Sequence, residues 1–300
     1  MLRRILAPAF ALLTLGQGFA IAQQAVDIDI WRTAGPFSAG LARPVKVVDS
    51  DGRDASPNVS RDGSRIVFSS TRSGTWEVWT CRSDGSGVFQ VTRLGDTPVG
   101  STRWSPDGKR IAFDGQKPGH YDLFVVNADG SGLRQLTTES STDVKPSWSK
   151  DGRWIYHTSN RTGEYQVWKI LSAGGEAVQV TRRGGYTPFE TMDGKFVYYA
   201  KGLNEHSLWR VPASGGEESF VLDNVVSNRW VMLKNGIAIL NMDAQPLPVI
   251  EFYDFATGRR RALDVLPKEG NIYGGGTAIA APPGGAWLLL CAIEPAKRPE

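Results

Sequence analysis

A polar turn that ends in glycine recurs along this 300-residue chain. The turns end at Gly63, Gly108, Gly152, Gly194, Gly236 and Gly285. Subtracting successive glycine numbers gives intervals of 45, 44, 42, 42 and 49 residues. A period of roughly 40 to 50 residues built from short strands is the size of one four-stranded propeller blade. The repeat therefore predicts an all-β fold, a six-bladed β-propeller with four strands per blade.

The same residue types recur at the same positions in the copies of the repeat. An aromatic residue stands sixteen positions after the turn glycine in four copies, and fifteen positions after it in a fifth. A second glycine follows about six positions later and marks a second hairpin, because glycine tolerates the positive φ that tight turns need. We expect the recurring aromatics to pack between sheets rather than to form a ligand cage. They are Trp79, Phe124, Trp168, Trp209 and Phe252.

The sixth copy stops before its blade is complete. After a strand-like run at residues 287–291, the chain ends where the third strand of that blade should begin. Two further strand-like runs, residues 26–31 and 44–48, precede the first blade. We expect these N-terminal strands, within residues 23–52, to complete the sixth blade, while residues 53–300 carry the repeats. Pairing the two ends of the chain closes the ring and removes exposed strand edges.

Residues 1–22 have the pattern of a secretory signal peptide. Two arginines precede an apolar run from residue 5 to residue 15, and small residues at positions 20 and 22 mark a cleavage site before Gln23. The apolar run is too short for a usual membrane-spanning helix. The pattern predicts ordinary export. The mature domain, residues 23–300, is expected to be periplasmic or secreted, with no stable membrane insertion.

The composition does not favour a nucleic-acid partner. The formal charge is +3, from 34 Lys and Arg against 31 Asp and Glu, and a phosphate-binding face normally needs a concentrated basic excess. The basic triplet at residues 259–261 follows a turn glycine and is interpreted as a solvated hairpin tip. Cys81 and Cys291 fall in different predicted blades, so we expect two separate buried thiols.

Several segments carry a resemblance to a known family. Residues 104–113 and 122–137 are similar to the WD40-like PD40 repeat of TolB-type propellers. Residues 69–74 and 158–163 match that family's hairpin between the second and third strands. The resemblance implies a six-bladed propeller, an exported location and a protein-binding role in an envelope complex. The chain departs from TolB in that only about thirty residues separate the signal from the first full blade, where TolB has an α/β domain.

An enzymatic role is the alternative interpretation. The PD40 repeat also resembles the propeller of prolyl oligopeptidase-type peptidases, but the Gly-x-Ser-x-Gly sequence of their separate hydrolase domain does not occur. His120, His157 and His206 fall in three different predicted blades, so no catalytic residue is assigned. Some six-bladed hydrolases and lyases hold a metal in the central channel with residues from different blades. The sequence itself indicates no cofactor and no metal ligands, and a small-molecule hydrolase or lyase with a channel metal stays open.

The repeat also predicts where a binding site would lie. The innermost strand of each blade runs into the polar turn, so residues five to nine positions before the turn glycine should approach the central channel or one rim. These residues differ in charge and size between blades, as a specific asymmetric site requires. The predicted binding set is Asp54, Ser56, Asn58, Ser101, Arg103, Asp143, Lys145, Tyr186 and Arg229. Our hypothesis is a noncatalytic propeller that binds a protein or peptide of the cell envelope.

Overall fold

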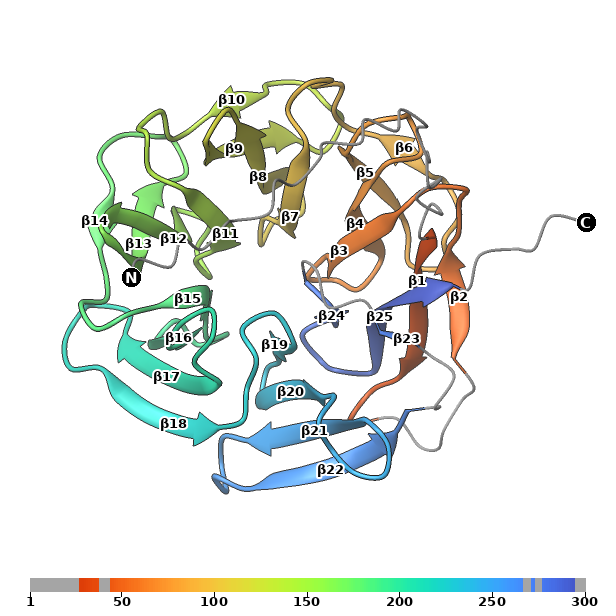
Figure 1. Cartoon of the computed structure of the whole chain (residues 1–300), viewed down its shortest axis with the longest axis vertical. Coiled ribbons are helices and arrows are strands. Elements are labelled where there is room, and N and C mark those ends of the chain that lie inside the picture. The colour runs from red at the N-terminus through yellow and green to blue at the C-terminus, as the bar shows by residue number, and fades with distance from the viewer. Residues whose placement is uncertain (1–26, 38–43, 267–270, 273–276, 295–300) are drawn as a thin grey trace, which may run out of the picture.

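The computed structural model describes residues 27–37, 44–266, 271–272 and 277–294. Six antiparallel sheets stand in a ring, with the strands of each sheet ordered from the ring centre outward (Figure 1). This arrangement confirms the predicted six-bladed, all-β propeller. The described residues contain no helix, and therefore none long and apolar enough to cross a membrane. The predicted signal peptide, residues 1–22, lies outside the described residues.

The first three blades each have three long strands and a two-residue outermost strand. Blade 1 consists of β3 (Asp54–Val59), β4 (Arg65–Ser70), β5 (Glu77–Arg82) and β6 (Phe89–Gln90). Blade 2 consists of β7 (Val99–Trp104), β8 (Arg110–Lys117), β9 (His120–Asn127) and β10 (Arg134–Gln135). Blade 3 consists of β11 (Asp143–Trp148), β12 (Trp154–Thr162), β13 (Glu164–Leu171) and β14 (Val178–Gln179). Their second strands carry β-branched and aromatic residues, which favour a pleated, buried surface.

Blades 4 and 5 keep the same strand order with longer outermost strands. Blade 4 consists of β15 (Tyr186–Glu190), β16 (Phe196–Ala200), β17 (Ser207–Pro212) and β18 (Ser219–Asp223). Blade 5 consists of β19 (Trp230–Met232), β20 (Gly236–Asn241), β21 (Val249–Asp254) and β22 (Arg260–Val265). All five of these blades are therefore continuous in sequence.

Blade 6 combines strands from both ends of the chain and confirms the predicted closure. Its strands are β23 (Asn271–Ile272), β24 (Ile279–Ala280), β25 (Trp287–Glu294), β1 (Asp27–Ala34) and β2 (Val45–Val48). The strands β1 and β25 lie side by side (Figure 1) and pair in unbroken antiparallel register along the whole of β1. Ile28 and Ile30 are 1% and 0% exposed and pack with Ile66 and Phe68 of blade 1. The ends of the chain therefore form both a sheet and an interface between blades.

The polar turn explains why the repeat is visible in the sequence. In blade 1 the Ser60 hydroxyl donates to Asp62 Oδ1 at 2.6 Å and accepts the Arg65 backbone N–H at 2.9 Å. Gly63 closes the turn at a φ of 75°, a conformation that residues with a Cβ rarely adopt. The same Ser-Asp or Thr-Asp hydrogen bond recurs in blades 2, 3 and 4.

The turn of blade 5 differs from this pattern. Leu233 donates its backbone N–H to the Gly236 carbonyl at 2.9 Å, so only two residues lie between them. Gly236 is therefore the first residue of β20 rather than the last residue of a turn. A Cβ at Gly236 would lie 2.1 Å from the Tyr253 carbonyl oxygen, so close strand contact explains this glycine. In blade 6, Gly285 has a φ of 63° and resembles the turn glycines of blades 1 to 4.

The recurring aromatics of the third strands are each covered by a cation. Phe124 and Phe252 are buried, at 5% and 1% exposure, whereas the three tryptophans are half-buried. Lysine or arginine head groups lie 4.1 to 5.6 Å from the five ring centroids. Each ring therefore packs beneath a basic side chain that screens it from water, which is a structural role.

Both cysteines are buried and free, as the sequence predicts. Cys81 lies on β5 and Cys291 on β25. Burial raises the pKa of each thiol to about 12, so both are protonated at neutral pH. These thiols act as small apolar groups within the core.

Candidate functional site

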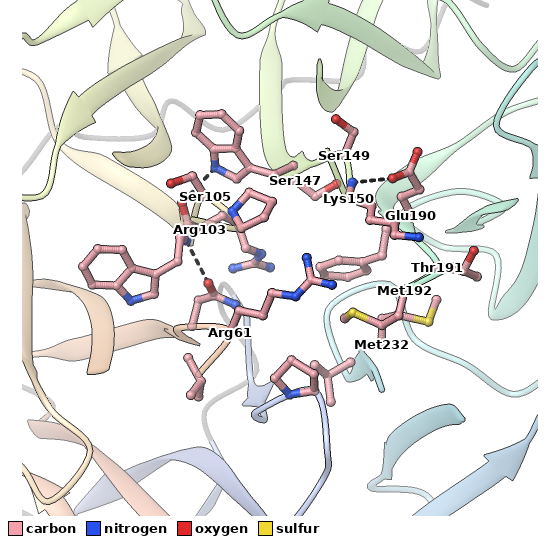
Figure 2. A pocket seen from close by; sticks show the side chains of 18 of the residues that line it. Arg61, Arg103, Ser105, Ser147, Ser149, Lys150, Glu190, Thr191, Met192 and Met232 are labelled. Atoms are coloured by element: carbon pink, nitrogen blue, oxygen red, sulfur yellow. Dashed lines mark hydrogen bonds between the residues drawn. The ribbon is translucent and has the colours of Figure 1, made fainter. Parts of the chain in front are cut away.

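The innermost strands lead into a hollow of about 130 Å³ at the end where each strand meets its turn. All six blades contribute to its lining, so the hollow lies at the centre of the ring (Figure 2). We call it the channel mouth. Its lining residues are Asn58, Val59, Arg61, Arg103, Trp104, Ser105, Pro106, Ser147, Trp148, Ser149, Lys150, Phe189, Glu190, Thr191, Met192, Val231, Met232, Ala281 and Pro283.

A bulge in the innermost strands changes the direction of the strand for the residues that follow it. In blades 1 to 4, the pairing between the first and second strands shifts register at the same place. Ser56, Lys145 and Thr187 adopt positive φ values of 53°, 58° and 52° there. A proline follows each of them, and its missing N–H suits a bulge that interrupts the ladder. Because a bulge bends its strand, the following residues reach the channel mouth.

Arg103 crosses the centre of the ring from blade 2. Its side chain is 4% exposed, and its Nη2 donates to Thr277 Oγ1 of blade 6 at 3.0 Å. Its guanidinium carbon lies 5.3 Å from the ring centroid of Phe189 in blade 4. Burial lowers the pKa of Arg103 to about 10, while the negative charge of Asp114 acts in the opposite direction. Arg103 is therefore a buried cation that contacts two blades beyond its own.

Arg61 and Lys150 add positive charge at the rim of the channel mouth. Both are exposed, and the Arg61 side chain extends toward the middle of the mouth in Figure 2. No hydrogen bond or ion pair of the Arg61 side chain is found within the described part of the chain. Lys150 Nζ donates to the Asp193 backbone oxygen at 3.2 Å. Arg61 therefore presents a free guanidinium to an incoming ligand.

Glu190 is a carboxylate at this mouth whose two oxygens already have partners. The Tyr156 hydroxyl donates to Glu190 Oε1 at 3.0 Å, and the Lys150 backbone N–H donates to Oε2. Burial, followed by the Glu190 charge and hydrogen bond, raises the pKa of Tyr156. Tyr156 is consequently a neutral donor that holds Glu190 in place.

Apolar side chains cover the opposite side of the mouth. The sulfur atoms of Met192 and Met232 lie near each other in Figure 2, on the blade 4 and blade 5 side. Phe189 packs against Trp230 in a T-shaped arrangement with centroids 4.8 Å apart. Methionine and aromatic side chains are adaptable binding surfaces. The mouth therefore combines basic groups with an apolar wall.

Buried ion pairs occupy the beginnings of two innermost strands. Asp143 on β11 accepts two hydrogen bonds from Arg161 Nη2, at 3.1 and 3.2 Å. Asp54 on β3 accepts the equivalent pair from Arg72 at 2.9 and 3.0 Å. Each arginine lies eighteen residues after its aspartate. This repeat of an ion pair is typical of a structural contact.

His157 lies beside the Asp143 ion pair in blade 3. It is 0% exposed, and its Nε2 lies 3.6 Å from Asp143 Oδ1. Burial lowers the pKa of His157 to about 4, although the Asp143 charge opposes this effect. The imidazole is therefore neutral at neutral pH.

Lys145 links the innermost strands of blades 2 and 3. Its Nζ donates to Ser101 Oγ at 3.1 Å. Asp114 on β8 accepts the backbone N–H of Ser101 at 2.9 Å and that of Lys145 at 2.8 Å. Burial lowers the pKa of Lys145, the Asp114 charge raises it, and the Arg103 charge lowers it further. Lys145 and Arg103 are therefore close enough to act on each other electrostatically.

The nine residues of the predicted binding set do not form one cluster. Asn58 and Arg103 line the channel mouth, where Asn58 Oδ1 accepts the Trp104 backbone N–H at 2.9 Å. Tyr186 is 9% exposed and packs against Tyr165, and burial raises its pKa. Arg229 is half-buried just before β19, and its backbone oxygen accepts the Leu240 N–H at 2.7 Å. The others lie at the bulges (Ser56, Ser101 and Lys145) or in the buried ion pairs (Asp54 and Asp143).

The second residue of each polar turn is the feature that the sequence analysis missed. In five of the six blades this residue lines the channel mouth. The five residues are Arg61, Pro106, Lys150, Met192 and Pro283. They vary in charge and size between blades at a fixed position of the turn, as the predicted binding residues of the innermost strands do. In the described residues, no three His, Cys, Asp or Glu side chains are grouped so that they could hold a metal ion.

Comparisons with known proteins agree with this architecture. A family model described as the TolB beta propeller domain, PD40, matches residues 97–246, which are 150 of the 300 residues. Over 66 residues the chain is 35% identical to an uncharacterized protein of Agrobacterium fabrum, a stretch that covers 20% of this chain and 22% of that protein.

Solved structures share the fold at low sequence identity. TolB from Acinetobacter baumannii matches with a TM-score of 0.66 and 15% identity, over 83% of this chain and 64% of that one. The chain thus spans less than two thirds of that TolB. An oligogalacturonate lyase in complex with manganese matches with a TM-score of 0.52 and 14% identity, over 75% of this chain and 69% of the lyase. At these identities the likeness concerns the fold alone.

Proposed function

The chain belongs to the TolB beta-propeller family, and from this membership we propose that it is an exported, noncatalytic propeller that binds a protein or peptide of the cell envelope at the channel mouth. The signal-peptide pattern of residues 1–22 supports the exported location, periplasmic or secreted. The resemblance of the repeats to envelope propellers supports a protein partner.

The channel mouth carries this proposal. It gathers side chains from six blades, and among them are arginine, methionine and aromatic side chains, the types that are enriched in protein interfaces. Arg61 supplies an exposed guanidinium, while Met192 and Phe189 supply a half-buried apolar wall. Anchors of this kind bind a partner when they are surrounded by a rim that excludes water.

A neutral substitution that fills the mouth tests the proposal. Met192→Trp narrows the mouth without changing its charge, and Leu133→Trp adds the same bulk at a site 44% exposed, just before β10 in the outer part of blade 2. Residues 23–300, unmodified and with each substitution, are used to capture envelope proteins. The captured protein is then purified, and its dissociation constant is measured for all three forms. We expect Met192→Trp to weaken its binding at least about tenfold, the loss of one anchor of about 1.4 kcal/mol.

The control variant should bind as the unmodified protein does. Melting temperatures of all three proteins verify that the substitutions leave the fold intact. Equal binding by the unmodified protein and by Met192→Trp would contradict binding at the channel mouth, and capture of no envelope protein at all would favour the hydrolase or lyase alternative.

A further inference from the structure

Among the described residues, Arg103 lacks the carboxylate partner that Arg72 and Arg161 have in the buried ion pairs. Arg161, whose side chain is 13% exposed, pairs with Asp143 at 3.1 Å. Arg103 is 4% exposed and has no carboxylate oxygen within 4.0 Å among the described residues. A buried guanidinium without a direct ion pair is costly, because the site removes water and the nearby carboxylate of Asp114 lies beyond 4.0 Å.

The hydrogen bonds of Arg103 leave part of its guanidinium unused. Nη1 donates to the Thr102 backbone oxygen at 2.8 Å, and Nη2 donates to Thr277 Oγ1 at 3.0 Å. Nε has no hydrogen-bond partner among the described residues. A guanidinium has five N–H donors, and the Arg103 side chain points into the channel mouth in Figure 2. The Arg103 guanidinium therefore has donors without a partner among the described residues, and its side chain lines the channel mouth.

Neighbouring charges leave this region with an excess of positive charge. Arg61 extends toward the same mouth from blade 1 and carries no ion pair within the described ranges. Lys145 lies within electrostatic range of Arg103, as does the carboxylate of Asp114. Both Asp114 oxygens accept backbone N–H groups. With Lys150 and Glu190, which also line the mouth, four cations thus stand against two carboxylates, and both carboxylates already accept hydrogen bonds.

We propose that Arg103 and Arg61 form an anion-binding pair in the channel mouth and that the bound partner presents a carboxylate to them. This inference rests on the proposed function, because it names the chemistry of the group that enters the same mouth. The carboxylate belongs to an acidic side chain or to a chain terminus of the partner.

The shape of the site favours a carboxylate as the anion. A carboxylate is planar and accepts two parallel N–H donors from one guanidinium. The Arg103 guanidinium lies against the Phe189 ring, 5.3 Å from its centroid, which leaves a narrow and partly apolar approach. A single negative charge offsets the unpaired charge of Arg103 without introducing a second unpaired charge of opposite sign.

Thermal unfolding in the presence of small anions tests the pair directly. Residues 23–300 are melted in about 100 mM acetate, phosphate or chloride at matched ionic strength, so that general screening is constant. We expect acetate to raise the melting temperature by about 2 °C over chloride, because a ligand that binds only the folded state stabilises it. Arg103→Met and Arg61→Gln should each abolish this rise. Arg183→Gln, at an exposed arginine between β14 and β15, should keep it.

Three results would overturn the inference. The first is that neither acetate nor phosphate raises the melting temperature of the unmodified protein. The second is an equal acetate-dependent rise in Arg103→Met and Arg61→Gln. The third is a rise with phosphate and none with acetate, which would replace the carboxylate with a different anion. Because Arg61 is exposed, the Arg61→Gln variant remains informative even if Arg103→Met does not fold.

Three short peptides identify the source of the carboxylate. A pentaglutamate with blocked ends offers side-chain carboxylates, a pentaglycine with a free C-terminus offers only the terminal one, and a fully blocked pentaglycine offers neither. Binding of the first or the second, lost in Arg61→Gln, supports the inference and names the source. Equal binding of the blocked pentaglycine would contradict it.

The two proposals fail separately. If Met192→Trp keeps its envelope partner while the acetate effect depends on Arg103, the proposed function fails and the carboxylate site stands. If Met192→Trp loses its partner but acetate has no effect, the binding function stands and the carboxylate inference fails.

Discussion

Blades 1 to 4 and blades 5 and 6 reach the same fold through different interactions. In the first four blades the turn begins with Ser or Thr, whose hydroxyl donates to the turn aspartate. Blade 5 has Leu233 at this position, at 0% exposure, and blade 6 has Pro282. Leu233 belongs to a cluster of twelve buried apolar residues between blades 5 and 6. Each blade therefore requires a turn between its first and second strands, and either polar or apolar contacts can stabilise that turn.

Blades 1 to 3 repeat a second polar contact that the later blades lack in the described residues. Thr92 Oγ1 accepts the Val78 backbone N–H at 2.9 Å and donates to Glu77. Thr137 and Thr181 make equivalent hydrogen bonds in blades 2 and 3. These contacts fix the outermost strand to the third strand. Local polar contacts thus define the early blades, whereas contacts distant in sequence define blade 6.

Removal of the N-terminal strands should break blade 6 and have the largest effect. Deleting residues 23–52 removes β1 and β2, exposes the edge of β25 and takes Ile28, Ile30 and Val48 out of the core. Each buried aliphatic side chain contributes about 2 kcal/mol, so we expect the melting temperature to fall by at least about 10 °C. Differential scanning calorimetry measures the change.

A matched pair of point variants sharpens this test. Ile30 in β1 and Ile111 in β8 are both 0% exposed. Replacement of either residue by Ala should cost about 2 to 5 kcal/mol of unfolding free energy. A cost near zero for Ile30→Ala, with a full cost for Ile111→Ala, would mean that closure contributes little to stability.

Ion pairs provide the next comparison, between blade 3 and blade 5. Asp143→Ala removes the buried carboxylate of Arg161 and leaves it only the exposed Glu139, whose Oε2 lies 3.5 Å from Nη1. We expect a loss of about 3 kcal/mol. Glu251 and Arg260 of blade 5 also pair, but their side chains are 14% and 24% exposed. Glu251→Ala should therefore cost only about 1 kcal/mol. Urea unfolding of both variants checks the order, and equal losses would contradict the difference between the blades.

The fold could be predicted from the sequence because its main signals are local. Gly63 follows Asp62 by one residue, and its positive φ is a requirement of the turn itself. The blade 5 turn was aligned on Gly236, but that glycine begins a strand, because contact with Tyr253 rather than turn geometry selects it. Periodicity alone does not distinguish these two causes.

The candidate site was less predictable because it depends on contacts across the ring. Arg103 reaches Phe189 and Thr277 only after the ring closes, and no local pattern contains that information. Asp143 looked like a variable site residue, yet Arg161 pairs with it eighteen residues later. Structural positions and binding positions both vary between blades, so variation does not distinguish them. The contacts of each side chain in the folded protein are needed to do so. The role of the predicted binding set stays a prediction.

Acidification should affect blade 3 and blade 6 in opposite directions. Burial lowers the pKa of His157 from 6.5 to about 4, so the unfolded chain binds the proton more readily, and stability falls as pH drops from 6.5 to 4. Burial raises the pKa of Asp29 on β1 from 3.8 to about 6, although Lys46 opposes this shift. The folded state then binds the proton more readily, and stability rises as pH drops from 6 to 3.8.

Single variants separate these two contributions. Asp29→Asn should lack the rise in unfolding free energy, up to about 3 kcal/mol, that Asp29 gives the unmodified protein between pH 7 and pH 4. His157→Gln should lack the fall of similar size that His157 causes over the same range. Urea unfolding at several pH values measures both slopes. Asp62 does not interfere, because hydrogen bonds from Ser60 and Ser64 lower its pKa to about 2 and its contribution is lost only below pH 3.8. Parallel slopes in the two variants would contradict the assignment.

The smallest effects are expected from substitutions in the turns of blades 2 and 5. Asp107 of blade 2 accepts the Ser105 hydroxyl at 2.6 Å and the Lys109 backbone N–H at 3.1 Å. Asp107→Ala removes both hydrogen bonds at an exposed position and should cost about 1 kcal/mol. Asn235 stands before the aligned glycine of blade 5, and its side chain makes no hydrogen bond within the described residues. Asn235→Ala should therefore change the unfolding free energy by less than about 0.5 kcal/mol. Chemical denaturation distinguishes the two values, and a larger loss for Asn235→Ala would show that blade 5 also depends on its turn side chain.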